Sequence, residues 1–378
     1  MKKLLCTVSV LSAGLAISPI AQSMEVYNDE KNALNFSGNL SVYYLNAEEF
    51  DEVNDGFSRF VFDYTNKLKY DWQALAKVAW GVQLSSTGDS IFVGNNGLTS
   101  TGPTSDVIWL RQGFVGVQHE KYGRITLGKQ WGVSYDIGGV TDVFEVFGAD
   151  AQGTYNFGTD GGFSGTGRAE EAMQYKVNYQ NFSFGLQYLP ADQKVPSSDE
   201  TANREIAFND SFGLSIIYKA PYDIGLGLAY NSAELSLHDS LQNIVKAEDE
   251  LITAHITYRS FANEGLHVAF VYTDMSNHDI NDVGKLMNKS TGMELFSEYR
   301  FDNDFSLILG YNSLEDNSTI DLGSNGNYHL QYFILSAKYN WDDDFYIYLE
   351  SKVDDSTLSN NSKAFAEDAT AIGMMYTF

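Results

Sequence analysis

The sequence predicts an all-β protein, a 16-stranded antiparallel transmembrane β-barrel whose third long loop folds inward. Apolar and polar residues alternate with a period of two along most of the chain, which is the pattern of strands with one apolar and one polar face. Short turns and long polar loops follow one another between these segments, as they do in membrane barrels. Tyrosine and phenylalanine are abundant, at 24 residues each, and such barrels carry girdles of aromatic residues.

The chain begins with a segment typical of a secretory signal. Two lysines precede a largely apolar run from Leu4 to Ile17, and small residues follow it. A basic end, an apolar centre and a small-residue cleavage site are the parts of such a signal. We therefore expect residues 1–23 to be removed and residues 24–378 to form the barrel. The only cysteine, Cys6, lies in the signal, so the mature chain would contain no disulfide.

Composition excludes several classes of protein. Fifty acidic residues against 24 basic ones give a formal net charge of −26, which disfavours nucleic acid as a partner. The aromatic content argues against a disordered chain. Beyond the signal no run of about 18 apolar residues occurs, so this chain would have to cross a bilayer as a barrel.

The alternation and the connections together give the number of strands. Seven short connections carry turn-forming residues between apolar runs. With the two chain ends they delimit eight hairpins closed by long loops, and hence sixteen strands. An even strand count with short turns on one side and long loops on the other is typical of outer-membrane barrels. The short turns lie at 70–72, 120–123, 180–181, 220–223, 262–265, 302–304 and 341–344, and the long loops include 86–106, 190–209 and 276–288.

Aromatic residues gather where strands meet the short turns. Tyr179 stands near Phe182, and Phe301 near Phe305, which favours rings at the headgroup level of a bilayer. Cross-strand aromatic pairs in a soluble barrel are the alternative.

The last strand ends on Phe378. This residue shares a face with Ile372, Met374 and Tyr376, and we expect that face to contact lipid. A chain that stops on an aromatic residue at the end of a period-two strand resembles the outer-membrane assembly signal, so we assign that role to Phe378.

One segment, Trp131–Arg168, is too long, too rich in glycine and too irregular to be a strand. A long loop without secondary structure inside a compact domain usually has a function. We expect it to fold inward and narrow a water-filled barrel, with Asp142, Glu145 and Asp150 facing basic residues on the wall. A surface insertion is the alternative that the segment alone leaves open.

Two stretches resemble the trimeric general diffusion porins of Gram-negative bacteria. The first is G-K-Q-W-G-V-S-Y-D from Gly128 to Asp136, continued by Thr141-Asp142 and by F-G-A-D at 147–150, and the second is the C-terminal strand. The resemblance spans the mature chain and is weaker in the other strands. It implies a third loop that folds into the lumen and places carboxylates opposite an arginine cluster.

The resemblance also assigns residues by position. Asp142 matches a loop carboxylate and Asp150 the acid that closes F-G-x-D, whereas Glu145 stands one residue before the family's glutamate. Arg59 and Arg168 match wall arginines. Other wall positions differ from the family: Lys129 stands for an arginine and Asn39 for a lysine.

Parity along the strands tests these wall residues independently. Arg59 and Arg168 fall on the inward faces of their strands, and Arg111 has inward parity with Gly113. Strict alternation places Lys129 on the lipid face, where a charge costs roughly 2–4 kcal/mol at mid-bilayer depth. We therefore expect a bulge or a strand end near Gly128.

These residues predict a passive channel of the cell outer membrane for ions and small hydrophilic solutes. Opposed charges across a narrow gap order water and disfavour apolar solutes, and rings of charge set ion preference. Because the chain is acidic and its basic wall reduced, we expect mild cation selectivity. The resemblance implies a homotrimer, contact with outer-membrane lipid and lipopolysaccharide, and insertion by the barrel assembly machinery. Loop 86–106 is long enough to reach a neighbour.

Other functions have less support. The six histidines are scattered, and no nucleophile motif, phosphate loop or metal-ligand spacing occurs, so we expect neither enzymatic activity nor a cofactor or bound metal. A substrate-specific porin for oligosaccharides or organic anions would carry a lumen track of aromatics; Tyr346 and Tyr348 have lumen parity but do not extend into a ladder. An adhesin or receptor barrel that acts through its outer loops is the third alternative.

Overall fold

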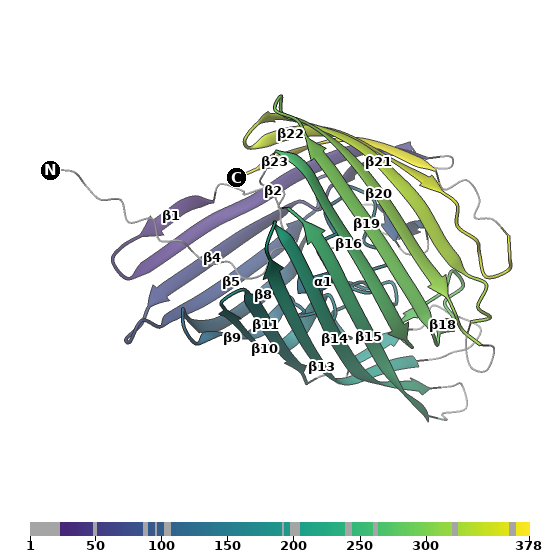
Figure 1. Ribbon diagram of the computed structural model, residues 1–378, viewed down its shortest axis with the longest axis horizontal. Coiled ribbons are helices and arrows are strands. Elements are labelled where there is room, and N and C mark those ends of the chain that lie inside the picture. Colours follow the sequence, from purple (N-terminus) through teal and green to yellow (C-terminus); the bar gives the residue numbers. More distant parts are fainter. Residues whose placement is uncertain are drawn as a thin grey trace.

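The strands form one closed antiparallel barrel in the computed structural model (Figure 1). Sixteen of them build the wall, which confirms the predicted number. Each pairs with the next in sequence, and β23 returns to β2 to close the ring. The structure describes residues 23–47, 51–85, 90–94, 97–101, 107–190, 193–196, 205–238, 244–259, 264–319, 324–362 and 368–378. The expected signal, residues 1–23, lies outside the described part except for Ser23.

The wall strands are joined by short turns at one end of the barrel and by long loops at the other, as the sequence predicts. They are β2 (Asn32–Ala47), β4 (Arg59–Lys67), β5 (Gln73–Val82), β8 (Ile108–His119), β9 (Gly123–Trp131), β10 (Arg168–Tyr179), β11 (Phe182–Leu189), β13 (Glu205–Ala220), β14 (Ile224–His238), β15 (Ile244–Tyr258), β16 (Gly265–Ser276), β19 (Ser290–Arg300), β20 (Phe305–Asp316), β21 (His329–Asp342), β22 (Phe345–Asp354) and β23 (Ala369–Thr377).

The remaining elements are short and lie beside or between the wall strands. β1 (Met24–Asn28) and β3 (Asp51–Asp55) pair with β2, and β12 (Gln193–Pro196) pairs with β13. β6 (Ser90–Gly94) with β7 (Gly97–Thr101), and β17 (Asp279–Ile280) with β18 (Leu286–Met287), form hairpins within long loops. α1 (Tyr135–Gly138) is a single turn. Among the described residues, no helix has the length and apolar character needed to span a membrane.

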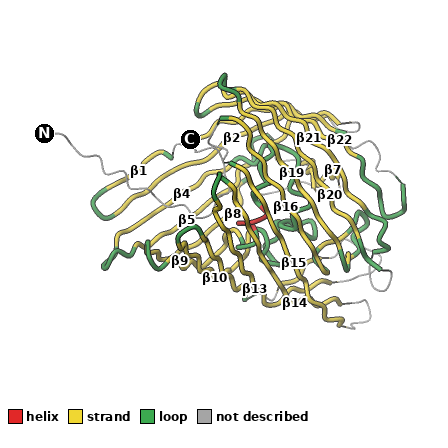
Figure 2. The backbone as a smooth tube through the Cα atoms, in the orientation of Figure 1, coloured by secondary structure: helices red, strands yellow, loops and turns green. Residues whose placement is uncertain are grey.

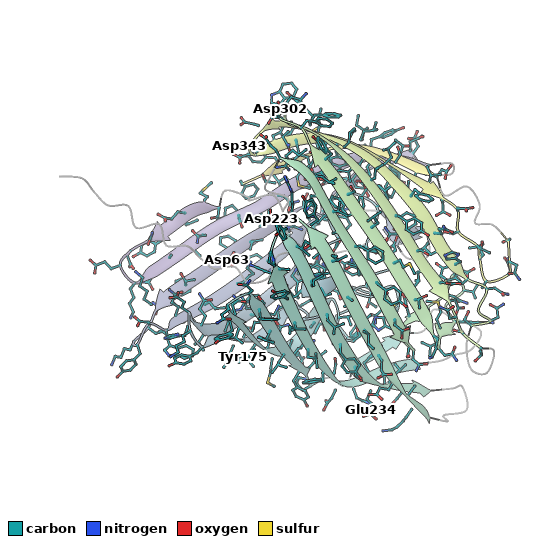
Figure 3. All side chains as sticks on the ribbon, in the orientation of Figure 1. Asp63, Tyr175, Asp223, Glu234, Asp302 and Asp343 are labelled. Atoms are coloured by element: carbon teal, nitrogen blue, oxygen red, sulfur yellow. The ribbon has the colours of Figure 1, made fainter. Side chains whose placement is uncertain are left out.

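The outer face of the wall is apolar and the inner face is polar. Along β11, Phe184, Leu186 and Tyr188 are exposed by 41%, 48% and 42%, whereas Gln187 between them is 1% exposed. Tyr175 on β10 follows the same rule, pointing away from the barrel (Figure 3). A soluble protein would bury the apolar face, so this arrangement fits a barrel surrounded by lipid.

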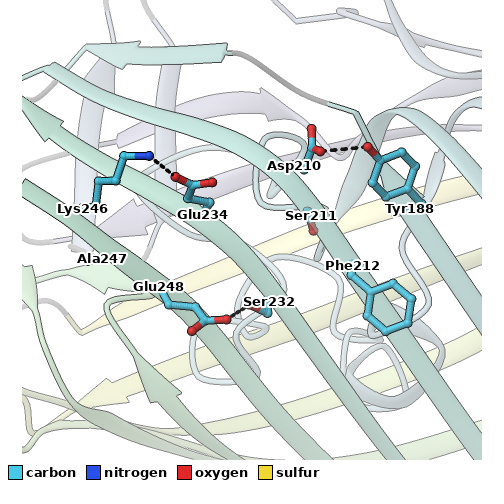
Figure 4. Close-up of a pocket in the computed structure, with 9 residues that line it drawn as sticks. All are labelled: Tyr188, Asp210, Ser211, Phe212, Ser232, Glu234, Lys246, Ala247 and Glu248. Atoms are coloured by element: carbon cyan, nitrogen blue, oxygen red, sulfur yellow. Dashed lines mark hydrogen bonds and ion pairs between the residues drawn. The ribbon is translucent and has the colours of Figure 1, made fainter.

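The apolar band ends near the long loops on β11, β13, β14 and β15. There the outward side chains become charged: Tyr188 donates to Asp210 at 2.8 Å, and Lys246 pairs with Glu234 at 2.6 Å (Figure 4). At the opposite end, aromatic rings gather beside the short turns, such as Phe301 and Phe305 with centroids 6.1 Å apart. These two borders bracket the surface that faces the membrane core.

The closing seam contains the C-terminal residue. The backbone of Phe378 exchanges two hydrogen bonds with Gly38 of β2, at 2.8 and 3.1 Å. Its ring lies 5.2 Å from that of Phe36 and 5.9 Å from that of Tyr376. A side chain at Gly38 would collide with the Phe378 ring, so glycine lets the terminal aromatic sit directly on the seam.

The third long loop, residues 132–167, lies inside the ring of strands (Figure 2). It packs against β21 and β22 through a shared apolar core. Val146, Phe147 and Ala151 of the loop are at most 8% exposed in this core, beside Tyr332 and Tyr346 of the wall. The predicted inward fold is therefore present.

Candidate functional site

Two wall glutamates hold the backbone of the inward loop. Glu350 on β22 accepts hydrogen bonds from the amides of Val146 and Phe147, both at 2.9 Å. Glu294 on β19 accepts from the amide of Ala151 at 2.8 Å and from the hydroxyl of Thr141. A loop without regular structure leaves its amides unpaired, and burying an unpaired amide costs free energy. Inward-facing carboxylates supply the missing acceptors.

A histidine from the sixth long loop adds a further anchor. Nδ1 of His278 lies 2.6 Å from the Asp249 carboxylate and Nε2 lies 2.7 Å from the carbonyl oxygen of Gly153. Both neighbours can accept, so the geometry suits an imidazole that donates from both ring nitrogens. Burial lowers the pKa of His278, but the charge and hydrogen bond of Asp249 outweigh burial and raise it overall. The outer loops are thereby coupled to the inward loop.

Strands that precede and follow the loop carry an arginine cluster. Arg59 on β4, Arg111 on β8 and Arg168 on β10 lie within electrostatic range of one another. Arg111 occupies a register shift between β5 and β8. Arg168 stacks over the ring of Trp131 at 5.0 Å and pairs with Asp160 at 3.1 Å. The three predicted arginines are thus together on one side of the lumen.

Asp142 is the predicted loop carboxylate that lies within electrostatic range of this cluster. It accepts hydrogen bonds from the hydroxyls of Tyr135 and Tyr155, both at 2.8 Å, and it interacts electrostatically with Arg59. The Tyr135 ring stacks on Trp131, with centroids 3.7 Å apart. Two tyrosines therefore fix the carboxylate in front of the arginines.

Glu145 contacts a basic residue that the sequence reasoning did not name. Its carboxylate lies 3.4 Å from Nζ of Lys338 on β21 and accepts a hydrogen bond from the hydroxyl of Tyr346 at 3.0 Å. The next residue, Val146, is 8% exposed in the loop–wall core. Because Val146 turns into that core, Glu145 is directed along the wall to Lys338.

Asp150 is an anchor between the loop and β21. It accepts a hydrogen bond from the Tyr332 hydroxyl, and its amide donates to Asn312 at 3.3 Å. Burial raises the pKa of the Asp150 carboxyl to about 6, while the Tyr332 hydroxyl and the charge of Lys352 oppose the rise. The side chain of Asp150 therefore points from the loop toward β21, and its direct partner is Tyr332 and not an arginine.

Lys129 pairs with one acid of the loop and with one acid of β10. Its Nζ lies 2.9 Å from Glu170 and 3.5 Å from Asp160. The irregularity expected here is present: Gly128 has φ +127°, and the pairing of β9 with β10 shifts register between Ala169 and Ala172. The extra residue is on β10, opposite Lys129.

Comparison with known proteins decides the family. The family model described as Gram-negative porin matches residues 94–378. The chain belongs to that family. An outer membrane porin protein LC from Enterobacteria phage PA-2 is 25% identical, with both chains fully covered. The solved structure of Salmonella typhi OmpF in complex with daunomycin aligns with TM-score 0.70 and 17% identity, covering 94% of this chain and all of that one. The trimer form of Vibrio cholerae OmpT aligns at 0.61 and 15% identity, covering 92% and 100%.

These relatives and the barrel place this porin in the outer membrane. Its anchors Glu294, Glu350, Lys338 and His278 were missed by sequence reasoning. The first three could have been found from the sequence, because each is a charged residue at an inward position of an alternating strand. His278 carried none, because it lies in a loop. Loop 86–106, expected to reach a neighbour, falls largely outside the described residues.

Proposed function

We propose that this porin forms a water-filled channel for passive diffusion of ions and small hydrophilic solutes, narrowed by its third loop. The observation that carries the proposal is the position of Asp142. Two tyrosines hold it on the inward loop within electrostatic range of Arg59, and the loop is hydrogen-bonded to the opposite wall by Glu294 and Glu350. The solute path then runs between the loop and the arginine cluster.

Opposed charges explain how such a path discriminates. A carboxylate on one side and guanidinium groups on the other set up a field across the path, and water aligns in it. Polar solutes replace that water with their own dipoles, whereas apolar solutes displace it without compensation. The path therefore favours small hydrophilic molecules.

The ion preference that we propose is mild and favours cations. The chain carries a formal charge of −26, and exposed acids such as Asp223, Asp302 and Asp343 occupy the short turns (Figure 3). Acids near a mouth raise the local concentration of cations. The arginine cluster acts against them at the narrowest part, which keeps the preference mild.

The proposed assembly is a homotrimer in outer-membrane lipid and lipopolysaccharide, inserted by the barrel assembly machinery. Support for the trimer comes from the Vibrio cholerae relative, whose structure is a trimer form. A substrate-specific oligosaccharide channel has no observation in its favour, because Tyr346 and Tyr348 are 5% and 3% exposed in the core under the loop. Rings packed in this way offer no face to a sugar.

The test is electrical recording from purified protein in planar bilayers. We expect three equal closing steps per inserted assembly and a reversal potential of the cation-selective sign in a potassium chloride gradient. A reversal potential of the anion-selective sign would overturn the proposed selectivity. Saturable block by one sugar or organic anion at micromolar concentration would replace the general channel with a substrate-specific one.

A further inference from the structure

A lysine outside the arginine cluster neutralises one of the loop acids. Lys338 on β21 and Glu145 have side chains that are 12% and 9% exposed, with 3.4 Å between Nζ and Oε1. The same ammonium lies 4.7 Å from the centre of the Tyr346 ring, whose hydroxyl binds the other carboxylate oxygen. A lysine, a tyrosine and a carboxylate thus form one closed contact at the edge of the loop.

The position of this contact along the barrel separates it from the anchor that Asp150 forms with Tyr332. Tyr332, which binds Asp150, precedes Lys338 on the same strand and the same face. Six strand residues correspond to about 20 Å at roughly 3.3 Å per residue. β21 runs from the long-loop end to the short-turn end, so Lys338 marks the side of the loop nearer the short turns.

The chemistry of the contact bears on permeation. Tyr346, whose hydroxyl binds Glu145, interacts electrostatically with Arg59. An unpaired Glu145 would therefore add its negative charge to those that the loop presents to the arginine cluster. With Lys338 in place, that charge is compensated at short range.

We infer that Lys338 is a selectivity-determining residue of this porin, because it cancels the charge of Glu145 and so limits the preference for cations. The inference rests on the proposed channel function and names a residue that sets its ion preference. Lys338 acts through Glu145 and is a positioning residue that need not touch the permeating ion.

Substitutions of Lys338 and of Glu145 should change the ion preference in opposite directions. Lys338→Met removes the cation and keeps most of the side-chain volume, so the permeability ratio of potassium to chloride should rise. Glu145→Gln leaves Lys338 uncompensated, so the ratio should fall. One unit charge about 7 Å from an ion, acting through water, changes the occupancy of that ion about two- to threefold. Cation and anion occupancies change in opposite directions, so each ratio should change about four- to ninefold.

The double variant Lys338→Met with Glu145→Gln should return the ratio close to that of the wild type, because both charges are removed. This cancellation is the interaction that a double-mutant cycle isolates. A merely structural role for the pair would change conductance in the same direction in both single variants and would not cancel. Lys338→Arg should keep the wild-type ratio, since it keeps the charge.

Reversal potentials are to be recorded at one fixed pH for all variants, on protein whose folding is verified by heat-modifiable migration in gels. Lys77→Met serves as the matched control, because Lys77 pairs with Asp63 at 3.2 Å on β5 and β4, in a contact that does not involve the loop. An unchanged ratio in Lys338→Met, or a shift toward chloride, would overturn the inference while leaving the channel function intact. Wild-type protein without channel activity would overturn the proposed function, and the inference with it.

Discussion

The three predicted loop carboxylates have the same chemistry but different neighbours, and the neighbours decide what each does. Asp142 is held by two tyrosines and remains in range of the arginines. Glu145 is compensated by Lys338. The buried side chain of Asp150 is bound by Tyr332 of β21. One acid thus shapes the field in the lumen, while the other two attach the loop to the wall.

Asp150 should make the attachment of the loop depend on pH. Burial raises the pKa of its carboxyl from the ordinary value of 3.8 to about 6, so the packed loop holds the proton more tightly than an opened loop does. The resulting stabilisation is fully present below pH 3.8 and is lost as pH rises through about 6. Between pH 5 and 7.5 the loop amides should lose about tenfold in protection from hydrogen exchange, after correction for the intrinsic rate.

Hydrogen–deuterium exchange of peptides that cover residues 146–153 measures this change. Asp150→Asn should reduce the pH dependence, because the amide does not titrate. Asp142→Asn is the matched control. This substitution alters a carboxylate of the same loop but leaves Asp150 in place, so the pH dependence of the protection should be retained. A wild-type protection that is the same at both pH values would contradict the prediction.

At single positions, the sequence predicted the wall better than the loop. Arg59 and Arg168 follow from parity, because a strand has only two faces and one of them contacts lipid. Glu145 and Asp150 do not follow from any period, since the direction of a side chain in an irregular loop depends on where each amide finds an acceptor. Those acceptors, Glu350 and Asn312, are distant in sequence.

As an element, the inward loop is held by its backbone more than by its own side chains. Its amides and carbonyls bond to side chains of the wall, including Thr273 and His255 in addition to the two glutamates. This explains why a segment so rich in glycine has a defined path: the wall specifies it. The length and glycine content of the segment predicted that it is not a strand. The identity of the wall anchors fixes where it lies.

Removing Glu350 should therefore widen the channel. Glu350→Ala leaves the amides of Val146 and Phe147 without their acceptor, and each unsatisfied buried amide costs about 1–3 kcal/mol. The loop edge should detach, so larger sugars should enter proteoliposomes in a swelling assay and open-channel noise should increase. Glu350→Gln keeps one acceptor oxygen, so its size limit for sugars should lie between those of the wild type and of Glu350→Ala.

Leu349→Ala provides the control for this change. Leu349 is the preceding residue of β22 and is 48% exposed on the lipid side, so its truncation should leave the size limit for sugars unaltered. If Glu350→Ala and the wild type admit the same sugars, the glutamate does not hold the loop.

At the scale of the whole molecule, the barrel depends on closure between its first and last strands. β2 pairs with β4 on one edge and with β23 on the other, so a single seam joins the two ends of the chain. The sequence predicted this closure from its even strand count and its terminal aromatic residue. It did not indicate the partner of Phe378, because Phe36 and Gly38 meet it only when the ring of strands is complete.

Truncation of Phe378 should weaken the seam and reduce assembly in cells. The ring contacts Phe36 and Phe60, with centroids 5.2 and 6.1 Å away, and a phenylalanine side chain contributes about 2 kcal/mol when it is buried. Phe378→Ala should lower the free energy of unfolding in urea by up to that amount. The backbone bonds to Gly38 remain, so the purified protein should still refold into detergent.

The outer-membrane yield in cells should fall by more than the loss of stability alone explains, because the terminal aromatic is proposed to be recognised during insertion. We expect the outer-membrane yield of Phe378→Ala to fall further than that of a second variant of equal stability. Phe333→Ala, with its unfolding free energy measured alongside, is the comparison: its ring is 53% exposed on the lipid face and contacts Tyr311 at 5.0 Å, away from the seam. Equal yields at equal stability would show that Phe378 acts only by packing, and its role as an assembly signal would have to be abandoned.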